Sequence, residues 1–148
     1  MRYSEGFVGR VFVLRLEDGD LLNDTLEQFA AERGVERGLA FYLGGSADGS
    51  RVVVGPDAAR EDAIVALVHT LAGPQEVLAV GTIFPDEQGK PSVHMHAASG
   101  REGAATVGCT RAGLRTWLVG EVVLLEISGS TAHRKTDTAS GFELLEIA

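Results

Sequence analysis

The chain has 148 residues, of which 45% are hydrophobic, and this length and composition indicate a single globular domain over residues 1–148. Its formal net charge of −8 argues against a surface that binds nucleic acid by charge, because such binding requires Lys and Arg to displace counterions from phosphates. The single cysteine excludes an intrachain disulfide, and no apolar run reaches the roughly 18 residues of a membrane span. Because Arg10 and Arg15 interrupt the first apolar stretch, it lacks the pattern of a secretory signal, and we expect a cytoplasmic protein.

The first predicted elements are a strand and a helix. Residues 7–16 are rich in Val, Phe and Leu with scattered charges, a pattern typical of a strand that is buried mainly on one face. After turn-forming residues, Leu22, Leu26 and Ala30 recur at helical spacing, and Gly34 provides a C-terminal stop. The sequence therefore predicts one main helix at about 21–33.

The rest of the chain is predicted to form strands. Apolar runs alternate with glycine, proline and other turn residues, as in a sheet with many tight turns. The predicted strands are residues 39–43, 52–54, 64–71, 76–84, 92–97, 104–109, 117–127 and 142–147. Segment 56–62 is expected to be an exposed loop, and segment 129–141 a mobile one. This pattern indicates an α/β fold of the α+β type, in which one helix covers a mostly antiparallel sheet.

The motif His94-Met95-His96 lies within a predicted strand. Side chains at positions i and i+2 leave a strand on the same face, about 6.5–7 Å apart along it, so both imidazoles can reach one metal ion. The return strand at 104–109 would bring Cys109 beside this pair. His94, His96 and Cys109, with a fourth position left to water, form a reasonable zinc site. The alternatives are two solvent-exposed histidines and a buried, inert cysteine.

The remaining histidines and two glutamates are weaker candidates. His69 is expected to be a solvated residue at a strand edge, and His133 an exposed loop residue. Glu121 and Glu126 lie in one apolar run at an odd separation, so they leave an unbroken strand on opposite faces. At least one of them must therefore lie near a sheet edge, a strand end or a subunit interface.

Arg134 and Lys135 form the only compact basic cluster in the sequence. Together with the more distant Arg111 and Arg115, they are the candidates for contact with nucleic acid, a phosphate or an acidic partner. The alternative is that these charges are simply solvated. The sequence contains no P-loop, dinucleotide fingerprint, nucleophile elbow or Cys-x-x-Cys pair, so no motif identifies a catalytic residue.

An ordered set of short motifs resembles the plant and prokaryote conserved domain (PPC) family, in its stand-alone prokaryotic form. The first half carries R-x-F-x-L-x-L at 10–16, D-G-D-L-L-x-x-x-L at 18–26, E-x-G at 32–34 and G-G-S-A at 44–47. The second half carries G-P-x-E-V-L at 73–78, G-K-P-x-V-H-M-H-A at 89–97, G-C-x-x-A-G at 108–113, E-V-V-L at 121–124 and a tail motif at 134–145. The H-x-H block is the most specific of these.

The resemblance implies a compact, sandwich-like domain that assembles as a homotrimer. Plant members precede this domain with an AT-hook, which this sequence lacks, and prokaryotic members are often described as DNA-binding by similarity. The family commonly has G-G-H-L after the H-x-H strand, which implies a third metal-binding histidine, whereas Cys109 stands at that position here. Because a thiolate is also a good zinc ligand, the site is expected either to persist with a preference for softer metals or to be lost.

Three functions are compatible with these observations. The first is a trimeric, metal-binding protein with a regulatory or small-ligand-binding role, with small molecules or proteins as partners. The second is a zinc-dependent hydrolase or lyase, which needs a general base that only Glu76, Glu102 or Glu121 would supply. The third is a DNA-associated transcriptional regulator, which the net charge makes doubtful. The sequence favours the first and leans against an enzyme.

Overall fold

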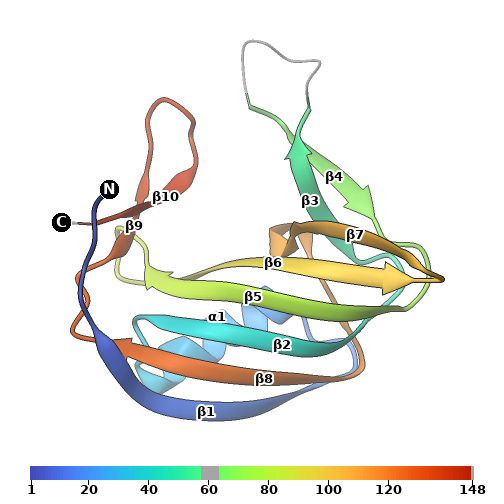
Figure 1. The fold of residues 1–148 in the computed structure, drawn as a ribbon, viewed down its shortest axis with the longest axis horizontal. Helices are drawn as coiled ribbons and strands as arrows, with labels where there is room; N and C mark the ends of the chain where they lie inside the picture. Colours follow the sequence, from blue (N-terminus) through green and yellow to red (C-terminus); the bar gives the residue numbers. More distant parts are fainter. Residues whose placement is uncertain (58–63, 148) are drawn as a thin grey trace.

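The computed structural model describes residues 1–57 and 64–147. Most of the predicted loop 56–62 therefore lies outside the described residues. Within them, the chain forms the elements labelled in Figure 1. In chain order these are β1 (Phe7–Glu17), α1 (Leu22–Arg33), β2 (Gly38–Ser46), β3 (Arg51–Pro56), β4 (Ala66–Thr70), β5 (Gln75–Pro85), β6 (Pro91–Arg101), β7 (Ala104–Cys109), the 3₁₀ helix η1 (Thr110–Ala112), β8 (Thr116–Ser128), β9 (His133–Thr136) and β10 (Glu143–Glu146).

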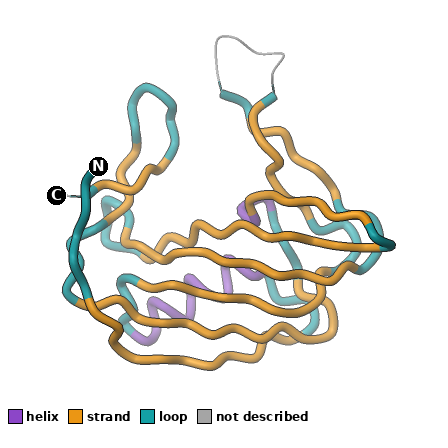
Figure 2. Tube along the Cα trace, in the orientation of Figure 1, coloured by secondary structure: helices purple, strands orange, loops and turns teal. Residues whose placement is uncertain are grey.

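The strands form one large antiparallel sheet and one small antiparallel pair. The large sheet has eight strands in the order β1-β8-β2-β5-β6-β7-β3-β4. Strands β9 and β10 pair with each other in a separate two-stranded sheet (Figure 2). Helix α1 lies against one face of the large sheet. The predicted fold class, a mostly antiparallel sheet with one main helix, is confirmed.

Helix α1 forms where the apolar spacing predicts it. Leu22, Leu26 and Ala30 follow one another at intervals of four residues and are fully buried between the helix and the sheet. Gly34 adopts the left-handed conformation, with φ of 63°, and its backbone N–H donates to carbonyls of the last helical turn. The hydrophobic core therefore lies between α1 and the inner face of the sheet. No helix in the described part of the chain is long and apolar enough to cross a membrane.

The outer face of the sheet is apolar and open. A row of cross-strand neighbours runs through Val13, Val123, Phe41 and Val80 on strands β1, β8, β2 and β5. These side chains are 81%, 40%, 43% and 49% exposed, in that order. Apolar patches of this kind on a small domain mark interaction surfaces. We call this row the open-face row.

The two glutamates of β8 lie on opposite faces of the strand. Glu121 is exposed and lies across from Arg15 of β1. Glu126 is largely covered and accepts hydrogen bonds from Arg10 of β1, at 2.7 Å from Nε and 2.6 Å from Nη2. These hydrogen bonds lower the pKa of Glu126 to about 2. The guanidinium of Arg10 also donates to the carbonyl of Arg33, so it joins β1 and β8 to the end of α1.

The segment predicted as a mobile loop, 129–141, contains strand β9. The polar composition of this segment favours a loop, but β9 pairs in register with β10. Arg134 within β9 is only 5% exposed and donates from Nη2 to the hydroxyl of Thr82 on β5, at 2.8 Å. The pairing with β10 is a hairpin between neighbouring segments, whereas the contact with β5 comes from a residue far away in the sequence, and together they override the local pattern.

Candidate metal centre

Strand β6 positions the two candidate histidines. Met95, which separates them in the sequence, is fully buried on the inner face of the sheet. Because side chains alternate along a strand, His94 and His96 lie together on the outer face. Their ring centroids lie 5.0 Å apart, with the ring planes at 81° to each other. The H-x-H spacing predicts this shared face.

Cys109, at the end of β7, lies directly opposite His96 in the β6–β7 pairing. Its side chain is buried, and one ligand atom from each of His94, His96 and Cys109 lies within 4.8 Å of the other two. Zinc bonds of about 2.0–2.1 Å to nitrogen and about 2.3 Å to sulfur place tetrahedral ligand atoms about 3.3–3.7 Å apart. Small side-chain rotations therefore suffice for these three groups to hold a zinc ion.

The surroundings of Cys109 and His96 favour the protonation states that bind metal. Burial raises the pKa of the Cys109 thiol, but hydrogen bonds from His94 and from the backbone and side chain of Arg111 outweigh it and lower the pKa to about 7. Burial also lowers the pKa of His96, and the charges of His94 and Arg111 add to this effect. Near neutral pH, His96 is therefore a neutral imidazole and a large fraction of Cys109 is thiolate.

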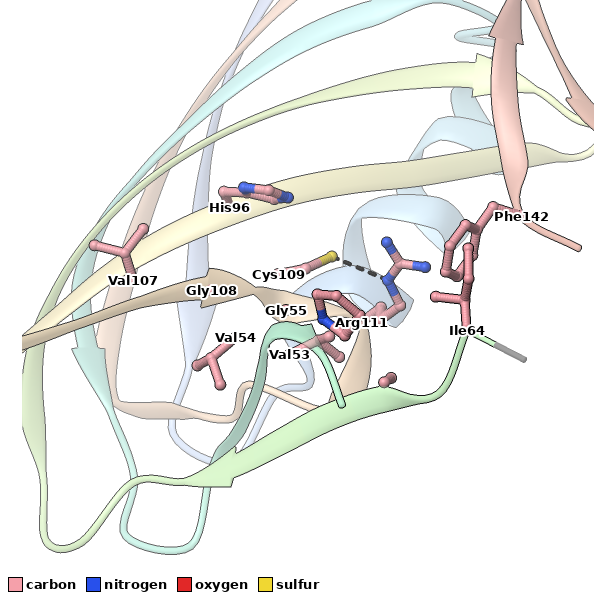
Figure 3. Close-up of a pocket in the computed structure, with 12 residues that line it drawn as sticks. Val53, Val54, Gly55, Ile64, His96, Val107, Gly108, Cys109, Arg111 and Phe142 are labelled. Atoms are coloured by element: carbon pink, nitrogen blue, oxygen red, sulfur yellow. Dashed lines mark hydrogen bonds between the residues drawn. The ribbon is translucent and has the colours of Figure 1, made fainter. Parts of the chain in front are cut away.

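Arg111, in η1, belongs to the candidate metal centre. Its Nε donates to Sγ of Cys109 at 3.1 Å, as Figure 3 shows. Its guanidinium carbon lies 5.7 Å from the ring centroid of Phe142. From the sequence alone, Arg111 is predicted only as a candidate contact for nucleic acid, a phosphate or an acidic partner. Its position two residues after Cys109 is a usable signal, but the 3₁₀ turn that folds its side chain back onto the thiol is not evident from the local pattern.

Two cavities adjoin the centre, and both are lined in part by Arg111 and Phe142. The first, of about 440 Å³, is mainly apolar, and His96, Cys109 and Arg111 are among its lining residues (Figure 3). The second, of about 350 Å³, is lined by His94 and by charged groups of both signs. We call these the apolar cavity and the polar cavity. The apolar lining comprises Val53, Val54, Pro56, Ile64, Ala66, Val107 and Phe142, and the charged lining of the polar cavity comprises Asp24, Glu27, Arg111, Arg134 and Glu143.

The four predicted basic contact residues do not form a single patch. Arg134 is buried, its guanidinium lies 5.4 Å from the ring centroid of Phe84, and burial lowers its pKa. Arg115 donates from Nη1 to the carbonyl of Gly19. Lys135 is exposed and lines a separate surface hollow near Glu36 and Asp86. Arg134 and Lys135 therefore do not form one exposed cluster, because alternate residues of β9 face opposite ways, and the contact role of these residues stays a prediction.

The other candidate groups lie away from the centre. His69 is exposed on the edge strand β4, as expected, whereas His133 is half-buried instead of exposed. The three carboxylates considered as general bases, Glu76, Glu102 and Glu121, are exposed and line neither cavity. The described residues therefore offer none of these three carboxylates as a base at the metal centre.

Comparison with known proteins identifies the family. The family model of the Plants and Prokaryotes Conserved (PCC) domain matches residues 3–128. This is the PPC family that the sequence motifs resemble. The chain belongs to the PPC family. No curated protein matches this PPC chain.

Solved structures share the PPC fold over nearly the full length of both chains. A PPC protein from Pyrococcus horikoshii is 23% identical, with a TM-score of 0.85, and the match covers 100% of this chain and 99% of the other. A metal-containing protein from Archaeoglobus fulgidus is 24% identical, with a TM-score of 0.84 and 99% of each chain covered. A candidate DNA-binding protein from Ralstonia eutropha is 21% identical, with a TM-score of 0.71, and the match covers 92% of this chain and 90% of the other. At these identities the likeness establishes the fold alone.

Proposed function

We propose that this PPC domain binds one zinc ion per subunit through His94, His96 and Cys109 and serves as a ligand-binding or regulatory protein. The observation that carries the proposal is the convergence of these three side chains within 4.8 Å. A set of two imidazoles and one thiolate is a donor combination that zinc favours. The metal content of the related Archaeoglobus fulgidus protein supports a metal in this fold.

The metal-binding residues are held by the sheet, and this favours a permanent site. His94 and His96 are fixed by β6 around the buried Met95, and Cys109 is fixed by its pairing with His96. Three protein ligands leave a fourth position on zinc for water or a small ligand. Because Cys109 binds metal only while it is reduced, the proposal also places the protein in the cytoplasm.

We further propose that three copies of the chain assemble through the open-face row. The four apolar side chains of this row are 40–81% exposed in the single chain, and burying them would stabilise an oligomer by the hydrophobic effect. The resemblance to the PPC family supports a trimer.

Ligand binding is favoured over catalysis and over DNA binding. Glu76, Glu102 and Glu121 lie away from both cavities, so none of the predicted bases is placed to assist a hydrolytic step. The net charge of −8 and the separation of Arg115, Arg134 and Lys135 leave the described part of the chain without the concentrated basic surface that duplex DNA requires.

Native mass spectrometry of tag-free protein tests both proposals in one spectrum. We expect a trimer carrying about one zinc ion per subunit. The double variant His94→Ala/His96→Ala should lose the metal and keep the circular dichroism spectrum, because both side chains lie outside the core. His69→Ala, which removes an exposed histidine on β4, is the matched control and should keep the metal. Full zinc occupancy in the double variant would overturn the metal proposal, and a monomer would overturn the trimer proposal.

A further inference from the structure

The apolar cavity beside the candidate metal centre has one permanently charged side chain among the described residues that line it. Arg111 is the only Lys, Arg, Asp or Glu among the described residues that line it, and most of the other lining groups are aliphatic or aromatic. Figure 3 shows the guanidinium at the end of the cavity formed by Cys109 and Phe142, with Val54 and Val107 farther along. A volume of about 440 Å³ lies within the range of small-molecule sites.

Among the described residues, no carboxylate pairs with the guanidinium of Arg111. Its Nε is used by the sulfur of Cys109, and its two terminal amino groups have neither a hydrogen bond nor an ion pair with any described residue. The terminal amino groups of a guanidinium form a rigid fork that matches a carboxylate. The Nε contact with Cys109 and the stacking on Phe142 hold this fork beside the cavity.

The charges that line the polar cavity indicate that an anion bound to Arg111 would lie on the side of the apolar cavity. Asp24, Glu27 and Glu143 line the polar cavity and would repel an anion there. No Asp or Glu lies among the described residues that line the apolar cavity, where the thiol of Cys109 is the one lining group that can carry negative charge. Arg134, which is buried and whose Nε has no hydrogen-bond partner among the described residues, adds positive charge behind Arg111.

We propose that the apolar cavity binds a small organic carboxylate, with its carboxylate on the terminal amino groups of Arg111 and its hydrocarbon body between β3, β7 and Phe142. Burial of the hydrocarbon supplies affinity, and Arg111 supplies selectivity for the charge. The apolar walls cannot hydrogen-bond the extra oxygens of a polyhydroxylated or multiply charged ligand, so these are selected against. The binding does not require a metal ion, so it goes beyond the proposed metal function.

The test uses 3-phenylpropanoate, its neutral analogue 3-phenylpropan-1-ol, and acetate, titrated calorimetrically into metal-free protein. We expect 3-phenylpropanoate to bind at least about tenfold more tightly than either of the other probes, the difference that one charged hydrogen-bonding interaction supplies. Equal binding of the acid and the alcohol, or no binding of the acid, would overturn the proposal. Repeating the titrations with zinc-loaded protein separates this result from the metal proposal.

Variants of Arg111 assign the charge selectivity to one residue. Arg111→Gln should remove the preference for the acid over the alcohol, and Arg111→Lys should keep part of it. Arg101→Gln removes the same charge from a residue that binds the carbonyl of Pro74 and lines neither cavity, so it should leave the preference intact. Unchanged selectivity in Arg111→Gln would overturn the proposal. A changed subunit count in that variant, measured by native mass spectrometry, would also overturn it by showing that Arg111 pairs with another subunit.

Discussion

At the scale of single residues, Cys109 shows how surroundings change the chemistry of a side chain. A lone buried cysteine is ordinarily an inert, protonated thiol. Here His94 and the side chain and backbone of Arg111 donate to the sulfur, and these hydrogen bonds more than offset the effect of burial on the pKa. The buried cysteine and the metal ligand, which are alternatives from the sequence alone, are therefore compatible descriptions of one residue.

The lowered pKa of Cys109 predicts a pH dependence for zinc binding. Thiolate forms as the pH rises through about 7, so zinc affinity should increase steeply with pH below about 7 and change little above it, where few protons must be displaced. Arg111→Gln should move the thiol pKa upward, because a hydrogen bond and a positive charge are lost. Thiolate absorbance of the metal-free protein and zinc titrations at several pH values measure both effects. A thiol pKa that stays near 7 in Arg111→Gln would contradict this assignment.

At the scale of elements, the proposed metal centre depends on how closely strands β5 and β6 approach each other. Gly81 of β5 lies opposite Met95, and a Cβ atom at Gly81 would lie 2.4 Å from Cβ of Met95 and 2.7 Å from the carbonyl oxygen of His94. Only glycine fits this position without moving β6. Because Gly81 has no side chain, strand β6, which carries both histidines, can lie this close to β5.

Gly81→Ala should destabilise the protein and weaken zinc binding together. Overpacking of this kind costs about 1–3 kcal/mol of unfolding free energy, and displacement of β6 would separate the histidines from Cys109. Gly100→Ala on β6 is the matched control, because its added Cβ would lie 3.7 Å from the carbonyl oxygen of Ala104 and fits. Chemical denaturation and zinc titration of both variants measure the two effects. Wild-type stability in Gly81→Ala would show that β6 shifts without cost.

At the scale of the whole molecule, the sheet has one face covered by α1 and one face open. The open-face row continues, in register, from Val80 to His96 and then to Cys109. The proposed assembly surface and the proposed metal centre therefore adjoin on the same side of the sheet. Assembly through the row would bring a neighbouring subunit close to the metal.

Phe41→Asp should convert the proposed trimer to a monomer. Phe41 lies in the middle of the open-face row, between Val123 and Val80, and a buried, unpaired carboxylate there would oppose association. Leu144→Asp makes the same kind of change at an exposed position of β10, outside the row, and should leave the subunit count at three. Light scattering coupled to size-exclusion chromatography measures the mass of each variant. A trimeric Phe41→Asp protein would exclude this face as the assembly surface.

Local patterns in the sequence determined the helix, most strands and the shared face of His94 and His96. Apolar residues recur with a period of about 3.6 residues in a helix and 2 in a strand, because these are the side chains that become buried. The elements can therefore be predicted without knowing the fold. The approach of Cys109 to the histidines also follows from the sequence, once 104–109 is read as the return strand.

Only the tertiary structure decided the surroundings of those residues. The contact of Arg111 with Cys109, the burial of Arg134 against Thr82 and the cavity beside the metal centre join segments that are far apart in the chain or turned by η1. The local pattern predicts that the charges of Arg111 and Arg134 are solvated, because it records only the spacing of apolar residues. It contains no information on which distant strand packs beside a given side chain. Packing between elements buried Arg134, which lies in a segment predicted as a loop, and placed Arg111 of η1 beside the thiol of Cys109.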